Sequence, residues 1–434
     1  MFYTLKVPAC FYSLFFCCFF LNTTKAQPAF VKTSGSHFIL NNKPYYYIGT
    51  NYWYGGLLAL QQDSVRGKER LRKELDFLKS QGVNNLRVLA GSEGIGQING
   101  VQRVNPVLQA KKGEFNLRLL EGLDYLLYEM GKREMFAVLF LSNNWEWSGG
   151  FLQYLNWNNQ LSDSTMQSKL GWDALRDNTS KFYSCMPCRQ DYEKQLRFIL
   201  NHHNKYTGRS YISEPAIMAW ELANEPRPMR ARANAAYSEW TLHTARLIRS
   251  LDKNHLITLG TEGDQGTESM ELFKAVHTPR EVDYLTLHIW PKNWSWFADT
   301  SITASLEGVI TKSRDYIRRH EQVADELKKP LVIEEFGLPR DRHSFAPGSA
   351  TTARDSYFAS VFSEWLRSKR DTGSIGGINF WAFGGSSRPV AGQLFWKKGD
   401  DFSGDPPQEE QGLNSVFDSD ESTWKLIRSF TEER

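Results

Sequence analysis

Two glutamates at the ends of short apolar segments could perform acid–base and nucleophilic chemistry together. Glu225 lies in the segment WELANEPR at 220–227, and Glu335 lies in VIEEFG at 332–337. Hydrolysis of a glycoside needs two carboxyl groups flanking the anomeric carbon. One protonates the leaving oxygen, and the other attacks that carbon or activates water. We therefore expect the side chains of Glu225 and Glu335 to converge at one site.

Each segment also contains a second glutamate, Glu221 in the first and Glu334 in the second. Side chains alternate between the two faces of a strand, so Glu334 and Glu335 are not both expected to point into the same cleft. Glu221 is expected to be a buried partner of a polar group on another strand.

The elements that would position these residues alternate along the chain. Short apolar runs, many of them rich in β-branched or aromatic residues, predict strands at 45–49, 85–89, 135–141, 217–222, 256–260, 284–288, 331–335 and 375–381. Amphipathic patterns predict helices at 66–80, 118–131, 191–203, 233–251, 304–327, 353–370 and 422–431. About eight repeats of strand and helix indicate parallel strands joined by helices, and a small hairpin is expected ahead of them at 38–45.

Two architectures satisfy this alternation, a closed barrel and an open doubly wound sheet. No GxGxxG or Walker loop follows an early strand, as a nucleotide-binding open sheet would need. The long irregular segments 91–114, 142–188 and 384–420 follow strand ends, where barrels build their sites. With no internal repeat and no linker, 27–434 is predicted to be a single (β/α)8 TIM barrel domain.

Residues 1–26 differ from the remainder of the chain. Lys6 precedes an apolar run of about 15 residues, and small residues follow up to Ala26, a pattern typical of a secretory signal peptide. A membrane anchor is the alternative, but the run is short for a span of about 20 residues. We expect cleavage and a secreted protein, extracellular or periplasmic.

Composition and charge exclude some partners. The chain has 434 residues, 41% hydrophobic and 23% charged, which is ordinary for a globular protein. Removing residues 1–26 takes away two lysines and no acids, so the net charge falls from +3 to +1. A nearly neutral protein has no electrostatic reason to bind nucleic acid or an anionic membrane, and a neutral polymer would suit it.

Two cysteines, Cys185 and Cys188, remain after residue 26. Two thiolates are too few for a zinc site, which needs four ligands. Export favours a local disulfide that fixes a loop, with free thiols as the alternative.

The order and placement of the two glutamate motifs resemble glycoside hydrolase family 5, in the clan of barrels with catalytic glutamates on strands four and seven. In that resemblance, Glu225 corresponds to the acid/base and Glu335 to the nucleophile. Arg87 corresponds to the strand-two arginine that bonds the nucleophile and His288 to the strand-six histidine. Trp381 corresponds to the strand-eight tryptophan under the sugar at the cleaved bond, and Asn224 would hold the sugar's 2-hydroxyl or Glu335. Many members have tyrosine two residues after the histidine. Here that residue is Trp290, whose indole can donate but not accept a hydrogen bond, so the tuning of Glu335 is expected to differ.

Further segments resemble the mannanase subfamily. One is Arg227, directly after the acid/base motif, and another is the segment 141–145, which contains Asn143, Asn144 and Trp145. The others are Trp290 with the nearby Trp294, and the late loop 404–416. Aromatic rings stack on sugar rings, and many of the 14 tryptophans lie in the long loops: Trp53, Trp145, Trp147, Trp290, Trp294, Trp296 and Trp381. The alternative for each is filling the core.

The resemblance implies a retaining double displacement on β-1,4-mannan, galactomannan or glucomannan, with carboxyl groups about 5–5.5 Å apart. No cofactor or metal is implied, and a monomer is expected. The alternatives are a β-1,4-glucanase of the same family and, from another class, a non-catalytic carbohydrate-binding barrel. The residues leave endo or exo action open.

Overall fold

A barrel of eight parallel strands forms the centre of the protein. The computed structural model describes residues 1–5, 29–60, 63–299 and 301–433. The sheet has the order β12-β11-β10-β5-β4-β15-β14-β13. Its two ends meet where the Asp283 amide donates to the Ile257 carbonyl at 2.8 Å. The strands are β4 (Tyr47–Asn51), β5 (Asn85–Leu89), β10 (Phe136–Phe140), β11 (Ile217–Glu221), β12 (Leu256–Thr258), β13 (Leu285–Ile289), β14 (Leu331–Phe336) and β15 (Ile375–Phe380).

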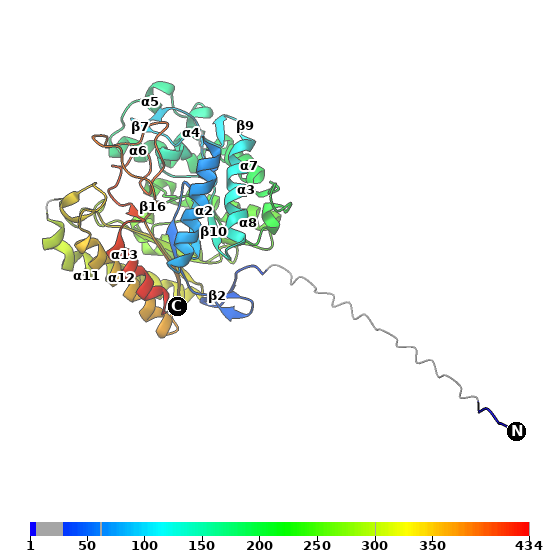
Figure 1. Cartoon of the computed structure of the whole chain (residues 1–434). Helices are drawn as coiled ribbons and strands as arrows, with labels where there is room; N and C mark the ends of the chain where they lie inside the picture. The colour runs from blue at the N-terminus through cyan, green and yellow to red at the C-terminus, as the bar shows by residue number, and fades with distance from the viewer. Residues whose placement is uncertain (6–28, 61–62, 300, 434) are drawn as a thin grey trace.

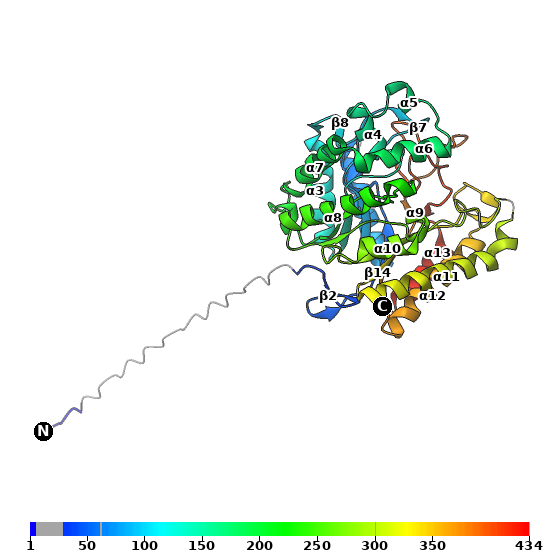
Figure 2. The same ribbon diagram turned by 180° about the vertical axis from the view of Figure 1, so that it is seen from behind.

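Helices cover the outside of this barrel (Figures 1 and 2). They are α2 (Ser64–Ser80), α3 (Leu117–Gly131), α7 (Met186–Leu200), α8 (Asn234–Leu251), α10 (Met270–His277), α11 (Ile302–Leu327), α12 (Thr352–Arg370) and α13 (Glu421–Thr431). The predicted (β/α)8 architecture is confirmed, and all seven predicted helices are present. The helix α10 was not predicted, because about two turns give too little periodicity to recognise.

A small antiparallel sheet packs against the amino end of the barrel. It consists of β1 (Lys32–Ser34), β2 (His37–Leu40) and β3 (Lys43–Pro44), so the predicted hairpin is present with one additional strand. The Phe38 ring packs edge-on against Tyr284, with centroids 5.3 Å apart. Gly377 leaves room for the ring of Tyr47, because a Cβ atom at 377 would lie 2.2 Å from it. Aromatic rings therefore close this end of the barrel.

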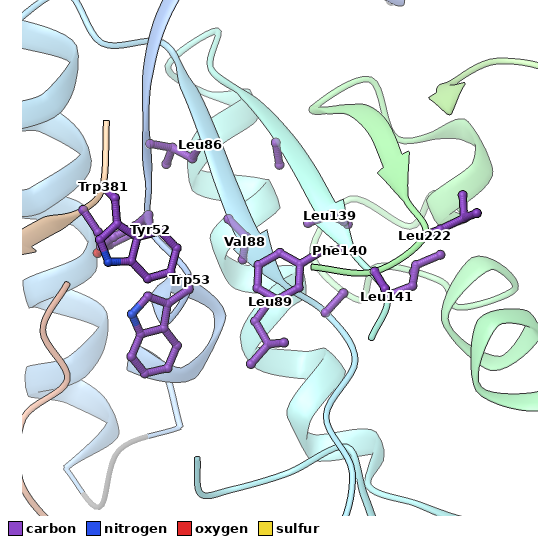
Figure 3. Close-up of a cluster of buried hydrophobic side chains, with 14 of the residues drawn as sticks. Tyr52, Trp53, Leu86, Val88, Leu89, Leu139, Phe140, Leu141, Leu222 and Trp381 are labelled. Atoms are coloured by element: carbon purple, nitrogen blue, oxygen red, sulfur yellow. The ribbon is translucent and has the colours of Figure 1, made fainter. Parts of the chain in front are cut away.

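The core continues from the barrel into the loops at its carboxyl end. Figure 3 shows Val88 of β5 and Phe140 of β10 near Trp53, which follows β4. All three side chains are buried, and the Trp53 indole donates to the Gly404 carbonyl at 2.9 Å. The loops at this end are thus attached to packed side chains.

The long segments after the strands are more regular than expected. The segment 142–188, predicted to be irregular, contains α4 (Gly150–Trp157), α5 (Asp163–Gln167) and α6 (Trp172–Thr179). These helices have about two turns or fewer, which is too short for their apolar pattern to be recognised in the sequence. The other short elements are α1 (Gly55–Leu58), β6 (Gln97–Ile98), β7 (Val101–Gln102), β8 (Gln109–Lys111), β9 (Glu114–Phe115), α9 (Asp264–Thr267), β16 (Phe383–Gly385) and β17 (Val416–Phe417).

Two expectations concern the chain ends and the cysteines. Apart from residues 1–5, the predicted signal peptide lies outside the described residues. Within the described ranges, no helix has the length and apolar character needed to cross a bilayer. Cys185 and Cys188 are joined by a disulfide at the start of α7.

Candidate active site

Glu225 and Glu335 meet at the carboxyl end of the barrel. Glu335 is in β14, and Glu225 lies four residues after the end of β11. One carboxylate oxygen of each and a ring nitrogen of His288 all lie within 4.8 Å of one another. The two glutamates line a cleft of about 760 Å³ and are nearly buried, with 6% and 2% of their surface exposed.

The Glu335 carboxylate accepts two N–H hydrogen bonds. One comes from Nη1 of Arg87, and the other comes from the indole of Trp290 at 3.0 Å. Arg87 is fully buried, and its remaining donors reach both oxygens of Glu221, at 2.8 and 2.6 Å, and Oδ1 of Asn224 at 2.7 Å. Glu221 is therefore a buried partner of Arg87, as expected. Trp290 donates to Glu335 although it replaces the family's tyrosine.

Glu225 is held by different neighbours and by an unusual backbone. Its Oε2 accepts from the Trp145 indole, and its Oε1 lies 2.7 Å from Nδ1 of His288. Its φ is 51°, in the left-handed region that L residues other than asparagine and aspartate seldom adopt. Such a conformation costs on the order of 1–3 kcal/mol, and residues held in it cluster at functional sites.

His288 connects the site to a third carboxylate below it. Its Nε2 lies 3.2 Å from Oε2 of Glu334. Glu334 does not line the cleft, which agrees with the alternation argument, but it also faces inward, 3.6 Å from Nε of Arg87. The expectation that Glu334 and Glu335 do not both point into the cleft is therefore confirmed, and Glu334 lies in the barrel interior below the cleft.

Burial dominates the proton equilibria of the site. Burial raises the pKa of Glu225, although Arg227 and the hydrogen bond from the Trp145 N–H lower it in part. Burial raises the pKa of Glu335 more strongly, and Arg87 lowers it only in part. Burial lowers the pKa of His288, so its ring is neutral near pH 7 and carries one N–H. Two carboxyl groups this close cannot both ionise readily, so the pair holds one proton.

The other residues predicted for the site divide into two groups. Trp145, Asn224, Arg227, Trp290, Trp294 and Trp381 line the cleft. Asn143 and Asn144 do not line it. Asn143 accepts from the Trp145 amide at 3.0 Å and from Nδ2 of Asn224 at 3.1 Å, so it supports two residues that do. Trp53 and Trp147 are core residues, packed edge-on at 5.3 Å.

Several cleft residues were not predicted: Glu146, Trp172, Glu262, Gln265, Asn293, Ser295, Gln408 and Glu409. Glu262 pairs with Arg227, with an Oε1 to Nη2 distance of 2.6 Å. In the sequence, the position of Glu262 shortly after the fifth predicted strand was the one indication that it belongs to the site. Gln408 and Glu409 lie in the late loop, and each has a buried side-chain oxygen without a hydrogen-bond partner. The indole Nε1 of Trp381 is also buried and has no hydrogen-bond partner. All three residues line the cleft, which could take a polyhydroxyl ligand.

Glu409 predicts a pH dependence of stability. Burial, with a contribution from nearby Asp405, raises the pKa of Glu409 to about 8. The unfolded carboxyl ionises near its ordinary value of 4.5, so between pH 4.5 and 8 the folded state holds a proton that the unfolded state has lost. Stability therefore falls as pH rises through this window, by up to about 1.4 kcal/mol per unit. Glu409→Gln, measured by urea unfolding at pH 5 to 8, should lose less stability than the wild type.

Glu410→Gln provides the matched control. Glu410 is the next residue, but it is partly exposed and lies 3.4 Å from Nζ of Lys292. Parallel stability curves for wild type and Glu409→Gln would show that Glu409 is not held protonated.

A closed α/β barrel with two opposed glutamates in the cleft at its carboxyl end defines a class, the glycoside hydrolase barrels. Comparison with known families also identifies the family. The chain belongs to glycoside hydrolase family 5, because the family described as GH family 5 beta-mannosidase-like matches residues 28–434. This confirms the resemblance seen in the motifs.

Named relatives fall in the same family. The chain is 28% identical to mannan endo-1,4-beta-mannosidase 1 of Arabidopsis thaliana over 390 residues, covering 85% of this chain and 86% of the relative. A family 5 mannosidase from Rhizomucor miehei superposes with a TM-score of 0.84 at 29% identity, over 94% of this chain and 98% of the other. An endo-beta-1,4-mannanase from Thermotoga petrophila shares the fold, with a TM-score of 0.64 and 23% identity, over 90% of this chain and 77% of the other.

Proposed function

We propose that this protein hydrolyses β-1,4-mannosidic bonds within mannan, galactomannan or glucomannan, with retention of configuration. The observation that carries the mechanism is the approach of the two carboxylates to within 4.8 Å. Retaining enzymes hold these groups about 5–5.5 Å apart, whereas inverting enzymes leave about 6.5–9.5 Å for a water molecule. Glu335 would attack the anomeric carbon while Glu225 protonates the leaving oxygen. Glu225 would then deprotonate the water that releases the sugar.

The hydrogen bonds support this division of roles. The guanidinium of Arg87 and the indole of Trp290 both donate to Glu335, and donors of this kind stabilise the ionised form. Burial raises the pKa of Glu335 as well and by itself would favour a proton there, but these two donors oppose it. We therefore place the single proton of the pair on Glu225, where neutral His288 can accept a hydrogen bond from it through Nδ1 if Nε2–H donates to Glu334. An acid/base group that stays protonated near neutral pH is what the first step requires.

The substrate assignment rests on the cleft and on the relatives. Trp145, Trp290, Trp294 and Trp381 line the cleft beside amide and carboxyl groups, a combination suited to sugar rings and their hydroxyls. The Arabidopsis thaliana relative is named for endo cleavage of mannan. Secretion, which such a substrate would favour, is proposed from the pattern of residues 1–26 alone.

A second candidate is exo action, with release of mannose from chain ends. It is favoured by the match to the Rhizomucor miehei mannosidase, with its TM-score of 0.84 and 98% coverage, against 0.64 for the Thermotoga petrophila endo-mannanase. One experiment separates endo from exo action. The protein is incubated with mannohexaose and with soluble galactomannan, the products are separated by chromatography, and the viscosity of the galactomannan solution is followed. Endo cleavage predicts a mixture of oligosaccharides and an early fall in viscosity, and exo cleavage predicts mannose with little change in viscosity.

Cellulose and mixed-linkage glucan serve as control substrates in that experiment. Faster hydrolysis of either than of mannan would favour a β-1,4-glucanase and contradict our assignment. Absence of turnover on every polysaccharide would favour a carbohydrate-binding barrel.

Reduction of the Cys185–Cys188 disulfide should change turnover little, because neither cysteine lines the cleft. Thiol titration of the unfolded, unreduced protein should find both cysteines oxidised. Activity before and after reduction, with the Cys185→Ser/Cys188→Ser variant as the control, tests the expectation. A large loss of activity in both would mean that the start of α7 shapes the site.

A further inference from the structure

Helix α6 begins at an aromatic residue that interior packing does not explain. Trp172 lines the cleft together with Glu225, and 51% of its surface is exposed. Large apolar rings are stabilised by burial. Ligand clefts are lined mainly by apolar and aromatic side chains with a few polar groups, so a half-exposed tryptophan in the cleft can contact a ligand.

Ion pairs attach α6 to the segment that follows Glu225. Arg230 contacts Asp173 at 3.0 Å and Asp177 at 2.9 Å, and the Arg176 guanidinium donates to the Met229 carbonyl at 2.7 Å. Exposed ion pairs contribute little individually. Three contacts between one helix and one segment nevertheless define the position of Trp172 relative to Glu225.

The neighbours of Trp172 show which part of the cleft it faces. Its ring stacks on that of Trp145, with centroids 6.2 Å apart and planes inclined by 26°. The indole of Trp145 donates to Glu225. If Glu225 protonates the leaving oxygen, as the proposed function requires, both rings lie on the leaving-group side of the scissile bond.

We propose that Trp172 forms a stacking platform for a sugar ring on the leaving-group side, one position beyond the sugar that contacts Trp145. The apolar face of a pyranose would cover the part of the indole that Trp145 and the Arg176 guanidinium, 5.9 Å from the ring centroid, leave exposed. The platform would bind chain substrates more tightly and leave the chemical step unchanged, because it is remote from the anomeric carbon. This inference rests on the proposed function and adds a residue that distinguishes long from short leaving groups.

The test compares two substrates in wild type and Trp172→Ala. One is an aryl β-mannoside whose leaving group is the aryl ring alone, and the other is mannohexaose. For Trp172→Ala, kcat/KM on mannohexaose should fall about 10-fold through KM, the upper range for one aromatic contact. The aryl mannoside should change less than about twofold, and Trp172→Phe should recover most of the loss because it keeps a ring.

Phe395→Ala is the matched control, since Phe395 is an exposed aromatic side chain, 49% exposed, that does not line the cleft. It should leave both substrates unchanged. An equal change on the two substrates in Trp172→Ala, or none on either, would refute the platform. Wild-type protein that hydrolyses neither mannoside would instead refute the proposed function, so the two failures are distinguishable. Thermal unfolding of each variant shows that it is folded.

Discussion

Glu335→Ala should lose at least about 10²-fold of its activity on mannan, because no covalent intermediate can form. Azide should restore turnover of an activated aryl β-mannoside and yield the α-mannosyl azide, since azide enters from the face that Glu335 vacates. Glu225→Ala should lose polymer activity by at least a similar factor. It should still form the glycosyl-enzyme from an aryl mannoside with a good leaving group, because that step needs little protonation. Azide should then release the β-mannosyl azide.

The configuration of the azide product, read by NMR, is the decisive measurement. The reverse pair of anomers would exchange the roles of the two glutamates. Turnover of mannan within about tenfold of wild type in both variants would mean that neither is catalytic. Glu262→Gln offers a comparison, because Glu262 lines the same cleft but is paired with Arg227.

Arg87→Met should produce the largest combined loss of stability and activity. Arg87 has no exposed surface and pairs with Glu221 and Glu335, so methionine would leave buried carboxylates without their cation. Removing one partner of a buried pair costs about 3–5 kcal/mol. Arg87 also lowers the pKa of Glu335, against burial. Without it the acid limb of kcat/KM should move to higher pH, by about one to three units.

Arg87→Lys tests whether charge alone is sufficient. Lysine keeps the charge but cannot reproduce the planar fork that reaches Glu221, Asn224 and Glu335 together. We expect an intermediate pH shift and an intermediate loss of stability by urea unfolding. An acid limb that stays in place in Arg87→Met would show that Arg87 does not govern the ionisation of Glu335.

The barrel could be predicted because its strands are short apolar runs buried on both faces. The strand β5 was located to the residue, whereas β4 begins two residues later than predicted, at Tyr47, because Tyr45 and Tyr46 extend the aromatic run on its amino side. Glu225 and Glu335 could be found because strand ends in a barrel converge, whatever the loops do. Arg87, in the middle of β5, was found through the resemblance to family 5.

Trp172 and Glu409 could not be found in the same way. The position of Trp172 depends on ion pairs such as that of Arg230 with Asp173, which join residues far apart in the sequence. The loop that carries Glu409 is folded around Asp405, which accepts hydrogen bonds from the amides of Gly412 at 2.8 Å and Asn414 at 2.9 Å. Neither arrangement has a periodic pattern, so only the three-dimensional structure reveals it.

The left-handed backbone at Glu225 has a consequence for engineering. Glycine adopts a φ of 51° without strain, so Glu225→Gly would relieve the backbone while removing the carboxyl group. Selection of variants for heat tolerance alone would therefore favour inactive proteins at this position. Lys328, at the carboxyl end of α11, has a similar φ of 53° and is exposed. It is not one of the residues assigned to the acid–base chemistry. Glycine is the residue preferred at such helix ends. Lys328→Gly is therefore a better substitution than Glu225→Gly for obtaining a thermostable catalyst.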